Sequence, residues 1–170
     1  LLGEPPGERD ALAQRRQRLA AIDEVLGRSG HFASFYVGYA NGDFFFVRPL
    51  ADEATRQALG APPGTRYLVQ DIERGTSPPR GRYLYLGAKL EPLGDEDHPE
   101  YPRQFDPRSR PWYRSAIAAY ERITTDPYLF FSSGNAGVTI ARRSPSGRAV
   151  VGADILLATL SASLGRQKVT

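Results

Sequence analysis

The residues Ala40-Asn41-Gly42 separate two runs of strand-forming residues, at 32–38 and at 43–48. An Asn-Gly pair tolerates the positive backbone angles of a tight turn, so it joins antiparallel strands readily. The pattern therefore predicts a β-hairpin. The strands of a hairpin are antiparallel, and together with the later strands they argue against the parallel sheet of a doubly wound fold.

The remaining segments alternate between strand and helix patterns. A long polar, proline-rich loop is predicted between Glu91 and Arg108. Antiparallel strands with helices inserted between them predict an α+β domain, with one central sheet and helices on its faces. Strands are expected at 65–73, 82–90 and 128–131, a second hairpin at 137–143 and 147–153, and helices at 51–59, 111–120 and 156–164.

Residues 8–27 have the composition of one polar helix with a narrow apolar stripe. The stripe can pack on the sheet or on a partner helix, and Ser29-Gly30 ends the helix. The apolar residues of the stripe are Leu12, Leu19, Ile22 and Leu26. The arginines expected to face water are Arg9, Arg15, Arg16 and Arg18.

Composition narrows the function classes. A length of 170 residues with 41% hydrophobic content fits one globular domain. The 22 basic and 19 acidic residues are mixed along the chain, which argues against a nucleic-acid surface. With no Cys and two His, thiolate chemistry and the usual zinc sites are excluded. No apolar run reaches the roughly 20 residues of a membrane span.

No catalytic motif stands out in the sequence. The chain lacks a phosphate-binding glycine loop, a Gly-x-Ser-x-Gly motif and paired histidines, so we expect no catalysis and no cofactor. An acidic cluster lacks the spacing of a calcium loop and is predicted to be a solvated loop. Its members are Glu91, Asp95, Glu96, Asp97 and Glu100, with His98 among them.

The segment at 105–114 places an arginine, the only tryptophan of the chain and a tyrosine around a helix start. Pro111 suits the first helical position, which puts Trp112 and Tyr113 in the first turn. Arg110, extended before the proline, can swing over the helix end, where free N–H groups favour an anion. A carboxylate satisfies these donors together. Alternatively, Arg110 bridges a surface carboxylate and the two aromatic residues belong to the core.

Two later residues supply complementary groups. Asp154 ends the apolar run 149–153, so its carboxylate is expected to be partly buried and to need a cation or several donors. A ligand ammonium would serve. The alternatives are a salt bridge to an arginine, or Asp154 as the N-cap of the following helix. Tyr128 begins an aromatic run, and its hydroxyl can reach a ligand or water.

Four segments, in their order and spacing, resemble the Cache modules of bacterial transmembrane receptors, specifically the membrane-distal module of double-Cache sensors. The resemblance covers most of the chain, and the helix at 8–27 matches the long N-terminal helix of such modules. It implies a PAS-like central antiparallel sheet beneath a small-ligand pocket. The segments are 106–113, 126–128, 138–140 and 150–155.

In the amino-acid-binding branch of that family, an arginine, a tryptophan and a tyrosine hold the ligand carboxylate. Tyrosines and a late aspartate hold the amine. The resemblance therefore implies Arg110, Trp112 and Tyr113 at the carboxylate, and Tyr128 and Asp154 at the amine.

One departure widens the ligand class. The branch usually has a tyrosine five residues before the arginine, where this chain has Phe105. One hydroxyl contact is therefore missing, and the expected ligand is a small amino acid, carboxylate or amine. Phe105, Tyr83 and Tyr85 are weaker candidates for the site, within an aromatic stripe that also supplies core and pocket wall.

The resemblance also implies the context of the chain. The chain is expected to divide into an N-terminal helix at 1–30, a ligand-binding module at 31–165 and a tail at 166–170. The module is expected to be non-catalytic, extracytoplasmic and tethered to the membrane in a longer protein, where membrane helices lead to a cytoplasmic output domain.

A second function class is a protein-interaction module without a small-molecule ligand, and the N-terminal helix permits a homodimer. The two classes differ at Arg110 and Asp154. If these residues pair with each other or with other side chains and no cavity lies between them, interaction is favoured. If both open onto one pocket, ligand sensing is favoured.

Overall fold

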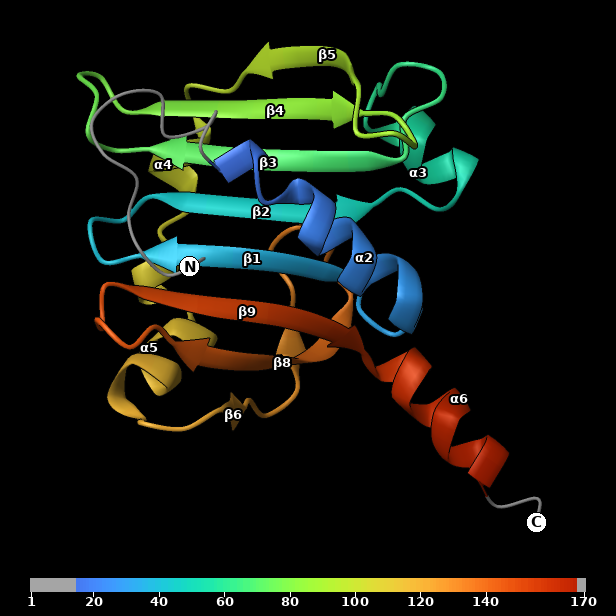
Figure 1. Cartoon of the computed structure of the whole chain (residues 1–170), viewed down its shortest axis with the longest axis vertical. Helices are drawn as coiled ribbons and strands as arrows, with labels where there is room; N and C mark the ends of the chain where they lie inside the picture. Colours follow the sequence, from blue (N-terminus) through green and yellow to red (C-terminus); the bar gives the residue numbers. More distant parts are fainter. Residues whose placement is uncertain (1–14, 168–170) are drawn as a thin grey trace.

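The computed structural model describes residues 15–167, which form one antiparallel sheet with helices on both faces (Figure 1). Among these residues the strand order is β5-β4-β3-β2-β1-β9-β8-β6, and β7 pairs with β8. The predicted α+β class is confirmed. The strands are β1 (Ser34–Tyr39), β2 (Phe44–Pro49), β3 (Tyr67–Glu73), β4 (Arg80–Leu86), β5 (Pro92–Asp97), β6 (Ile123–Thr124), β7 (Tyr128–Leu129), β8 (Ala136–Arg143) and β9 (Ala149–Leu156).

The turn between β1 and β2 forms as the Asn-Gly pair predicts. Gly42 has a φ of 88°, and the side-chain oxygen of Asn41 accepts a hydrogen bond from the Asp43 N–H at 3.0 Å. The resulting register pairs Tyr36 with Phe46. Because side chains alternate between faces, Phe44 joins these two rings on one face of the sheet and Phe45 lies on the other.

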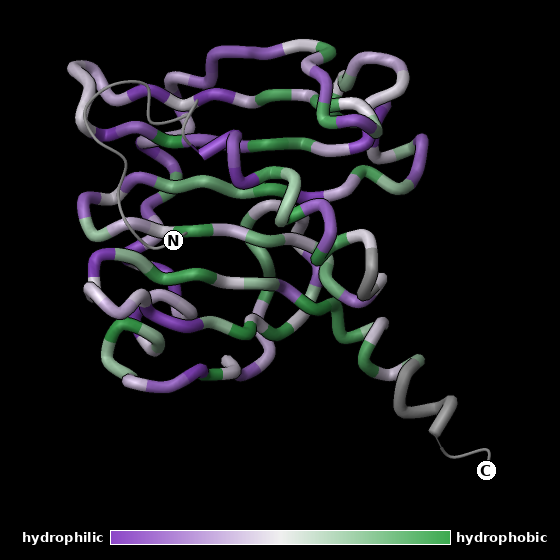
Figure 2. Tube along the Cα trace, in the orientation of Figure 1, coloured by the Kyte–Doolittle hydropathy of each residue, from purple (hydrophilic) through white to green (hydrophobic). Residues whose placement is uncertain are grey.

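The two faces of the sheet carry different layers. Helix α2 (Leu19–Ser29) covers one face, where its apolar stripe packs in a cluster with Phe45 and Val47. Helix α4 (Tyr101–Gln104), the short helix η1 (Pro107–Ser109) and helix α5 (Pro111–Ala118) cover the other. Apolar segments concentrate in the central strands between these layers (Figure 2). A separate short helix, α3 (Glu53–Ala58), lies between β2 and β3.

The N-terminal helix differs in part from its prediction. Its predicted start, including Arg9 and Leu12, lies outside the described residues. Arg15 and Arg16 are helical, a turn follows, and α2 then runs to Ser29 with Gly30 in the left-handed conformation. The stripe packs on the sheet.

The prediction that Arg15 faces water was wrong. Its side chain is 3% exposed and forms ion pairs of 2.6 Å with Asp43 and with Asp71. Both aspartates lie at one end of the central strands, on the face that α2 covers. Composition could not reveal this arrangement, because the carboxylates are 28 and 56 residues away along the chain.

The predicted loop between Glu91 and Arg108 was also wrong in part, because it contains β5, α4 and η1. Strand β5 is the edge strand next to β4, and its acidic residues are mostly exposed. Charge on an edge strand opposes pairing with another chain, which explains why a strand here carries so few apolar residues. Strand β4 ends at Leu86, before the predicted Leu90, which has a positive φ of 63°.

Helix α6 (Leu157–Gln167) follows β9 directly and projects away from the sheet (Figure 1). Asp154 is a residue of β9, so the interpretation of Asp154 as a helix N-cap was wrong. Within residues 15–167, the helices are too short or too polar to cross a membrane.

Candidate functional site

The arginine–proline step before α5 has the geometry that the sequence predicts. Arg110 is extended, with φ −80° and ψ 147°, and Pro111 begins the helix. Trp112 therefore lies in the first turn and packs directly on the sheet at Gly38. A Cβ at Gly38 would lie 2.7 Å from the Trp112 ring, so only glycine allows this close approach.

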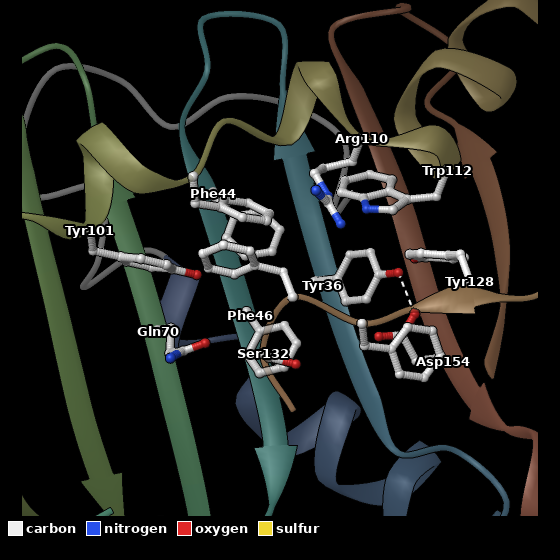
Figure 3. A pocket seen from close by; sticks show the side chains of 13 residues that line it. Tyr36, Phe44, Phe46, Gln70, Tyr101, Arg110, Trp112, Tyr128, Ser132 and Asp154 are labelled. Carbon is white, nitrogen blue, oxygen red and sulfur yellow. Dashed lines mark hydrogen bonds between the residues drawn. The ribbon is translucent and has the colours of Figure 1, made fainter. Parts of the chain in front are cut away.

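A small cavity lies between α5 and the sheet (Figure 3). Its volume is about 30 Å³ for the centres of water molecules, which is room for two or three waters. Arg110 and Trp112 lie at one side and Asp154 and Tyr128 at the other. The lining residues are Tyr36, Phe44, Phe46, Gln70, Tyr101, Phe105, Arg110, Trp112, Tyr128, Phe130, Phe131, Ser132 and Asp154.

The guanidinium of Arg110 has no carboxylate partner within the described part of the chain. Its central carbon lies 5.9 Å from the ring centres of both Phe105 and Phe131. The interpretation in which Arg110 bridges a surface carboxylate is therefore wrong for residues 15–167. The cation is held over two aromatic faces, and its hydrogen-bond donors are available to a ligand.

At the other side of the cavity, Asp154 accepts hydrogen bonds from three hydroxyl groups. Tyr36 donates at 2.5 Å, Thr139 at 2.6 Å and Ser34 at 2.8 Å. Tyr128 joins the network through Thr139, with 2.6 Å between the two hydroxyl oxygens. The Asp154 carboxylate is thus hydrogen-bonded by neutral donors only, and it forms no ion pair with any described residue.

Burial raises the pKa of Asp154, and the three hydroxyl donors and the charge of Arg110 oppose the rise. A buried carboxylate without a cation is costly, so a cation that enters the cavity would stabilise its ionised form. Burial also raises the pKa of Tyr36 well above its usual value, which keeps the phenol protonated as a donor.

Five of the predicted residues line the cavity: Arg110, Trp112, Tyr128, Asp154 and Phe105. Tyr113 does not. It follows Trp112 on α5 and, like Trp112, packs against Gly38, but it belongs to the core beside the cavity and does not line it. The phenol of Tyr113 is buried there, and burial raises its pKa.

Tyr83 and Tyr85 also lie away from the cavity, although both lie on the face of the sheet that carries the cavity. Tyr83 stacks on His98 with 3.8 Å between ring centres and meets Tyr101 edge-on. Tyr85 packs with Leu50 and Leu68 in a separate cluster. Tyr101 lies between Tyr83 and the cavity.

Several lining residues were not predicted as site residues, notably Tyr36, Gln70, Tyr101 and Ser132. Tyr36 could have been found, because side chains alternate between the faces of a strand, and Tyr36 therefore lies on the same face as Ser34 and Gly38 of the predicted strand. Tyr101 and Ser132 lie in segments predicted as a loop and a connection, where sequence gives no direction for a side chain.

Comparison with known proteins gives sequence relatives among signalling proteins. Adenylate cyclase 1 of Rhizobium meliloti is 36% identical over 170 residues, covering 98% of this chain and 24% of the cyclase. Methyl-accepting chemotaxis protein McpA of Pseudomonas putida is 30% identical over 153 residues, covering 86% of this chain and 23% of the receptor. The chain thus spans about a quarter of the length of these relatives. No family model matches the chain.

Solved structures include the ligand-binding domain of the Pseudomonas fluorescens chemoreceptor CtaA in complex with L-valine. It has 22% identity and a TM-score of 0.46, and the match covers 86% of this chain and 48% of that domain.

The antiparallel sheet with a covered cavity is typical of a PAS-like ligand-binding domain. Together with the similarity to a chemotaxis receptor over 86% of the chain, it is consistent with the Cache-type sensor domain that the four sequence segments indicate.

Proposed function

We propose that the chain is the extracytoplasmic ligand-sensing domain of a bacterial transmembrane receptor, which binds a small carboxylate- or amine-bearing molecule. One observation carries the proposal. Arg110 and Asp154 have opposite charges, line the same cavity, and pair neither with each other nor with another described ion. A ligand with a carboxylate and an amine complements both ends.

The carboxylate end of the proposed site is formed by Arg110 and Trp112. A guanidinium fork binds a carboxylate through two parallel hydrogen bonds. The indole N–H of Trp112 is a further donor, and it has no hydrogen-bond acceptor among residues 15–167. Phe105 contributes a ring where a tyrosine would contribute a hydroxyl, so this end offers fewer donors.

The amine end of the proposed site is formed by Asp154, with Tyr36 and Tyr128 beside it. An ammonium can donate to the Asp154 carboxylate and to the two phenol oxygens together. The ligand class is therefore small amino acids first, and monofunctional carboxylates or amines second. The ligand-binding domain of CtaA, to which the chain is similar, was solved with L-valine, a ligand of this class.

The size of the cavity adds a condition. A volume of about 30 Å³ does not admit an amino acid, so residues 130–133 have to move outward on binding. Phe131, which belongs to both the cavity wall and this segment, is 50% exposed. A wall that packs on one side only can move at modest cost.

We propose that the domain itself is non-catalytic and that output lies elsewhere in a longer, membrane-tethered protein. The division into a helix at 1–30, a module at 31–165 and a tail at 166–170 belongs to the same proposal. The similar cyclase matches over only about a quarter of its length, so its name assigns no activity to this chain.

The second candidate, a protein-interaction or dimerisation module, is less well supported. It predicts that Arg110 and Asp154 have structural partners. Asp154 has three hydroxyl donors, but Arg110 pairs with no described carboxylate and both residues line one cavity. The apolar stripe of α2 is occupied by the sheet. A homodimer through the N-terminal helix would therefore have to use other residues.

The test is a thermal-shift screen of amino acids, monocarboxylates and amines on the wild-type domain and on Arg110→Ala. A ligand at 100 times its dissociation constant adds about 2.7 kcal/mol to the stability. We expect at least one carboxylate-bearing ligand to shift the wild type and to lose most of its effect on Arg110→Ala.

The matched control is Arg114→Ala, which removes an exposed arginine from the same helix. It should keep the shift. The proposed site is wrong if no compound shifts the wild-type domain, or if the shift survives Arg110→Ala unchanged.

A further inference from the structure

Arg48 is a partly buried cation without an ion-pair partner within residues 15–167. Its Nε atom is inaccessible to water and has no hydrogen-bond acceptor among these residues. Nη1 reaches the Ser132 carbonyl at 3.4 Å, which is a long hydrogen bond. An arginine with unused donors in a buried place calls for an acceptor that the fold does not supply.

Arg48 opens onto a second cavity, a groove at the end of the sheet with a volume of about 410 Å³. The groove lies next to the small cavity. The two share Phe130, Ser132 and Asp154 as walls.

Three of the other charged groups that line the groove, Asp52, Asp154 and Arg66, contact described side chains. Asp52 caps α3, where it accepts from the Thr55 N–H and hydroxyl at 2.7 Å each. Asp154 accepts its three hydroxyl hydrogen bonds, and Arg66 lies 5.9 Å from the ring centre of Tyr67. His31 lines the groove as well. Burial lowers the pKa of Arg48, while Tyr83 and Asp52 raise it. Neither forms an ion pair with Arg48.

The strand register places Arg48 in line with the proposed amine end. Tyr36 pairs with Phe46, so two residues along the strands Ser34 lies beside Arg48 on the same face. Ser34 pairs in turn with Asp154 on β9. Two strand spacings separate Arg48 from Asp154, on the order of 10 Å between their backbones. A flexible arginine side chain can cover part of that distance.

We propose that Arg48 binds a carboxylate in this groove and that the preferred ligand is dicarboxylic, with an acidic amino acid as the simplest class. The inference rests on the proposed function, because it extends the same ligand beyond Arg110 and Asp154. The Nε atom is inaccessible to water without a ligand, so the Arg48 side chain has to turn before the second carboxylate can accept from Nε and one terminal nitrogen, in the side-on arrangement of an arginine–carboxylate pair. The second carboxylate would replace the Ser132 carbonyl, which frees residues 130–133 to move outward.

The test compares L-glutamate with L-glutamine by isothermal titration calorimetry, since the two differ little in shape and by one charge. We expect the wild-type domain to bind one glutamate per chain, at least about tenfold tighter than glutamine. Arg48→Gln should lower the affinity for glutamate to that for glutamine and leave glutamine unchanged. Arg48→Lys, which keeps the charge but loses the fork, should retain part of the preference.

Arg66→Gln is the matched control, because it removes another arginine of the groove, and it should keep the preference for glutamate. The inference is overturned if wild type binds the two equally, or binds neither while other carboxylates bind. It is also overturned if Arg48→Gln keeps the preference. A stoichiometry of two glutamates per chain, with acetate competing for one of them, would show that the groove is a separate site for a monocarboxylate. That result would also overturn the inference. A failure of the proposed function shows differently, as binding that is indifferent to Arg110→Ala.

Discussion

The charge of Asp154 depends on what lies beside it. Burial raises its pKa above 3.8, so in the ligand-free domain the neutral form persists to a higher pH than in the unfolded chain. The stability that this group contributes is therefore fully present below pH 3.8 and is lost as pH rises through the raised pKa. A bound ammonium reverses this preference, because it favours the ionised carboxylate.

A pH dependence of binding follows. The affinity for an amino acid should fall as pH falls through the raised pKa of Asp154, since the ammonium of the ligand stays charged throughout that range. Asp154→Asn should weaken binding at neutral pH by about tenfold or more and remove the pH dependence. Calorimetry of both proteins between pH 4 and pH 8 checks this. An unchanged pH profile in Asp154→Asn would contradict the assigned role.

Helix α2 is tied to the sheet by apolar and by ionic contacts. Leu19, Ile22 and Leu26 pack on the strands, while Arg15, just before the helix, holds Asp43 and Asp71 at 2.6 Å. Burial raises the pKa of Asp71 to about 6, and the attraction of Arg15 limits the rise. Asp43 also accepts from the Arg74 N–H at 2.7 Å.

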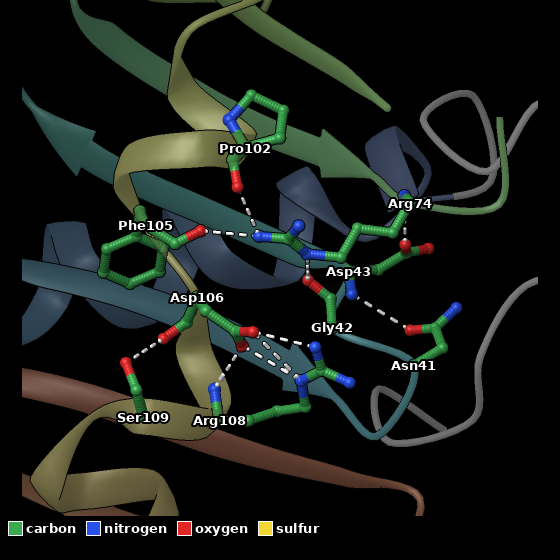
Figure 4. A network of polar contacts seen from close by, with 9 residues as sticks. All are labelled: Asn41, Gly42, Asp43, Arg74, Pro102, Phe105, Asp106, Arg108 and Ser109. Carbon is green, nitrogen blue, oxygen red and sulfur yellow. Dashed lines mark hydrogen bonds and ion pairs between the residues drawn. The ribbon is translucent and has the colours of Figure 1, made fainter. Parts of the chain in front are cut away.

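Arg74 links this anchor to the layer above the cavity. Its side chain donates to the carbonyl groups of Gly42, Pro102 and Phe105 at 2.7–2.9 Å (Figure 4). Polar contacts thus connect three parts of the domain: the backbone at Phe105 beside the cavity, the β1–β2 turn, and the start of the N-terminal helix at Arg15.

Arg15→Ala should destabilise the domain by about 3–5 kcal/mol at neutral pH, because it leaves two buried carboxylates without their cation. Arg16→Ala, which removes a partly exposed neighbour, should change the stability by about 0.5 kcal/mol or less. Urea unfolding at pH 8 and pH 5 measures both. The loss should be smaller at pH 5, where Asp71 is largely protonated. A loss in Arg15→Ala no larger than in Arg16→Ala would contradict a structural role for the ion pairs.

The sequence predicted the sheet well because its signals are local. An Asn-Gly turn and alternating strands determine the two hairpins, and Pro111 determines the start of α5. The predictions that were wrong concern features that depend on residues distant in the chain. Strand β5 is stabilised by pairing with β4 rather than by its own acidic residues, and Arg15 is buried by carboxylates distant in the chain.

The candidate site was also predictable where its residues belong to local sequence segments. Arg110, Trp112, Tyr128 and Asp154 belong to recognisable segments, and the fold brings them to one cavity. Tyr113 follows Trp112 by one position and packs against the same Gly38, so only the placement of α5 on the sheet decides that Trp112 lines the cavity and Tyr113 does not. Tyr36 and Tyr101 needed the strand register and the α4 position, which no single segment encodes.

The most direct test of a two-ended site is a crystal structure of the domain with the strongest amino-acid ligand from the thermal-shift screen. We predict the ligand carboxylate about 3 Å from the guanidinium of Arg110, and its amine about 3 Å from the carboxylate of Asp154. Residues 130–133 should be displaced outward. A ligand that contacts neither Arg110 nor Asp154 would contradict the account.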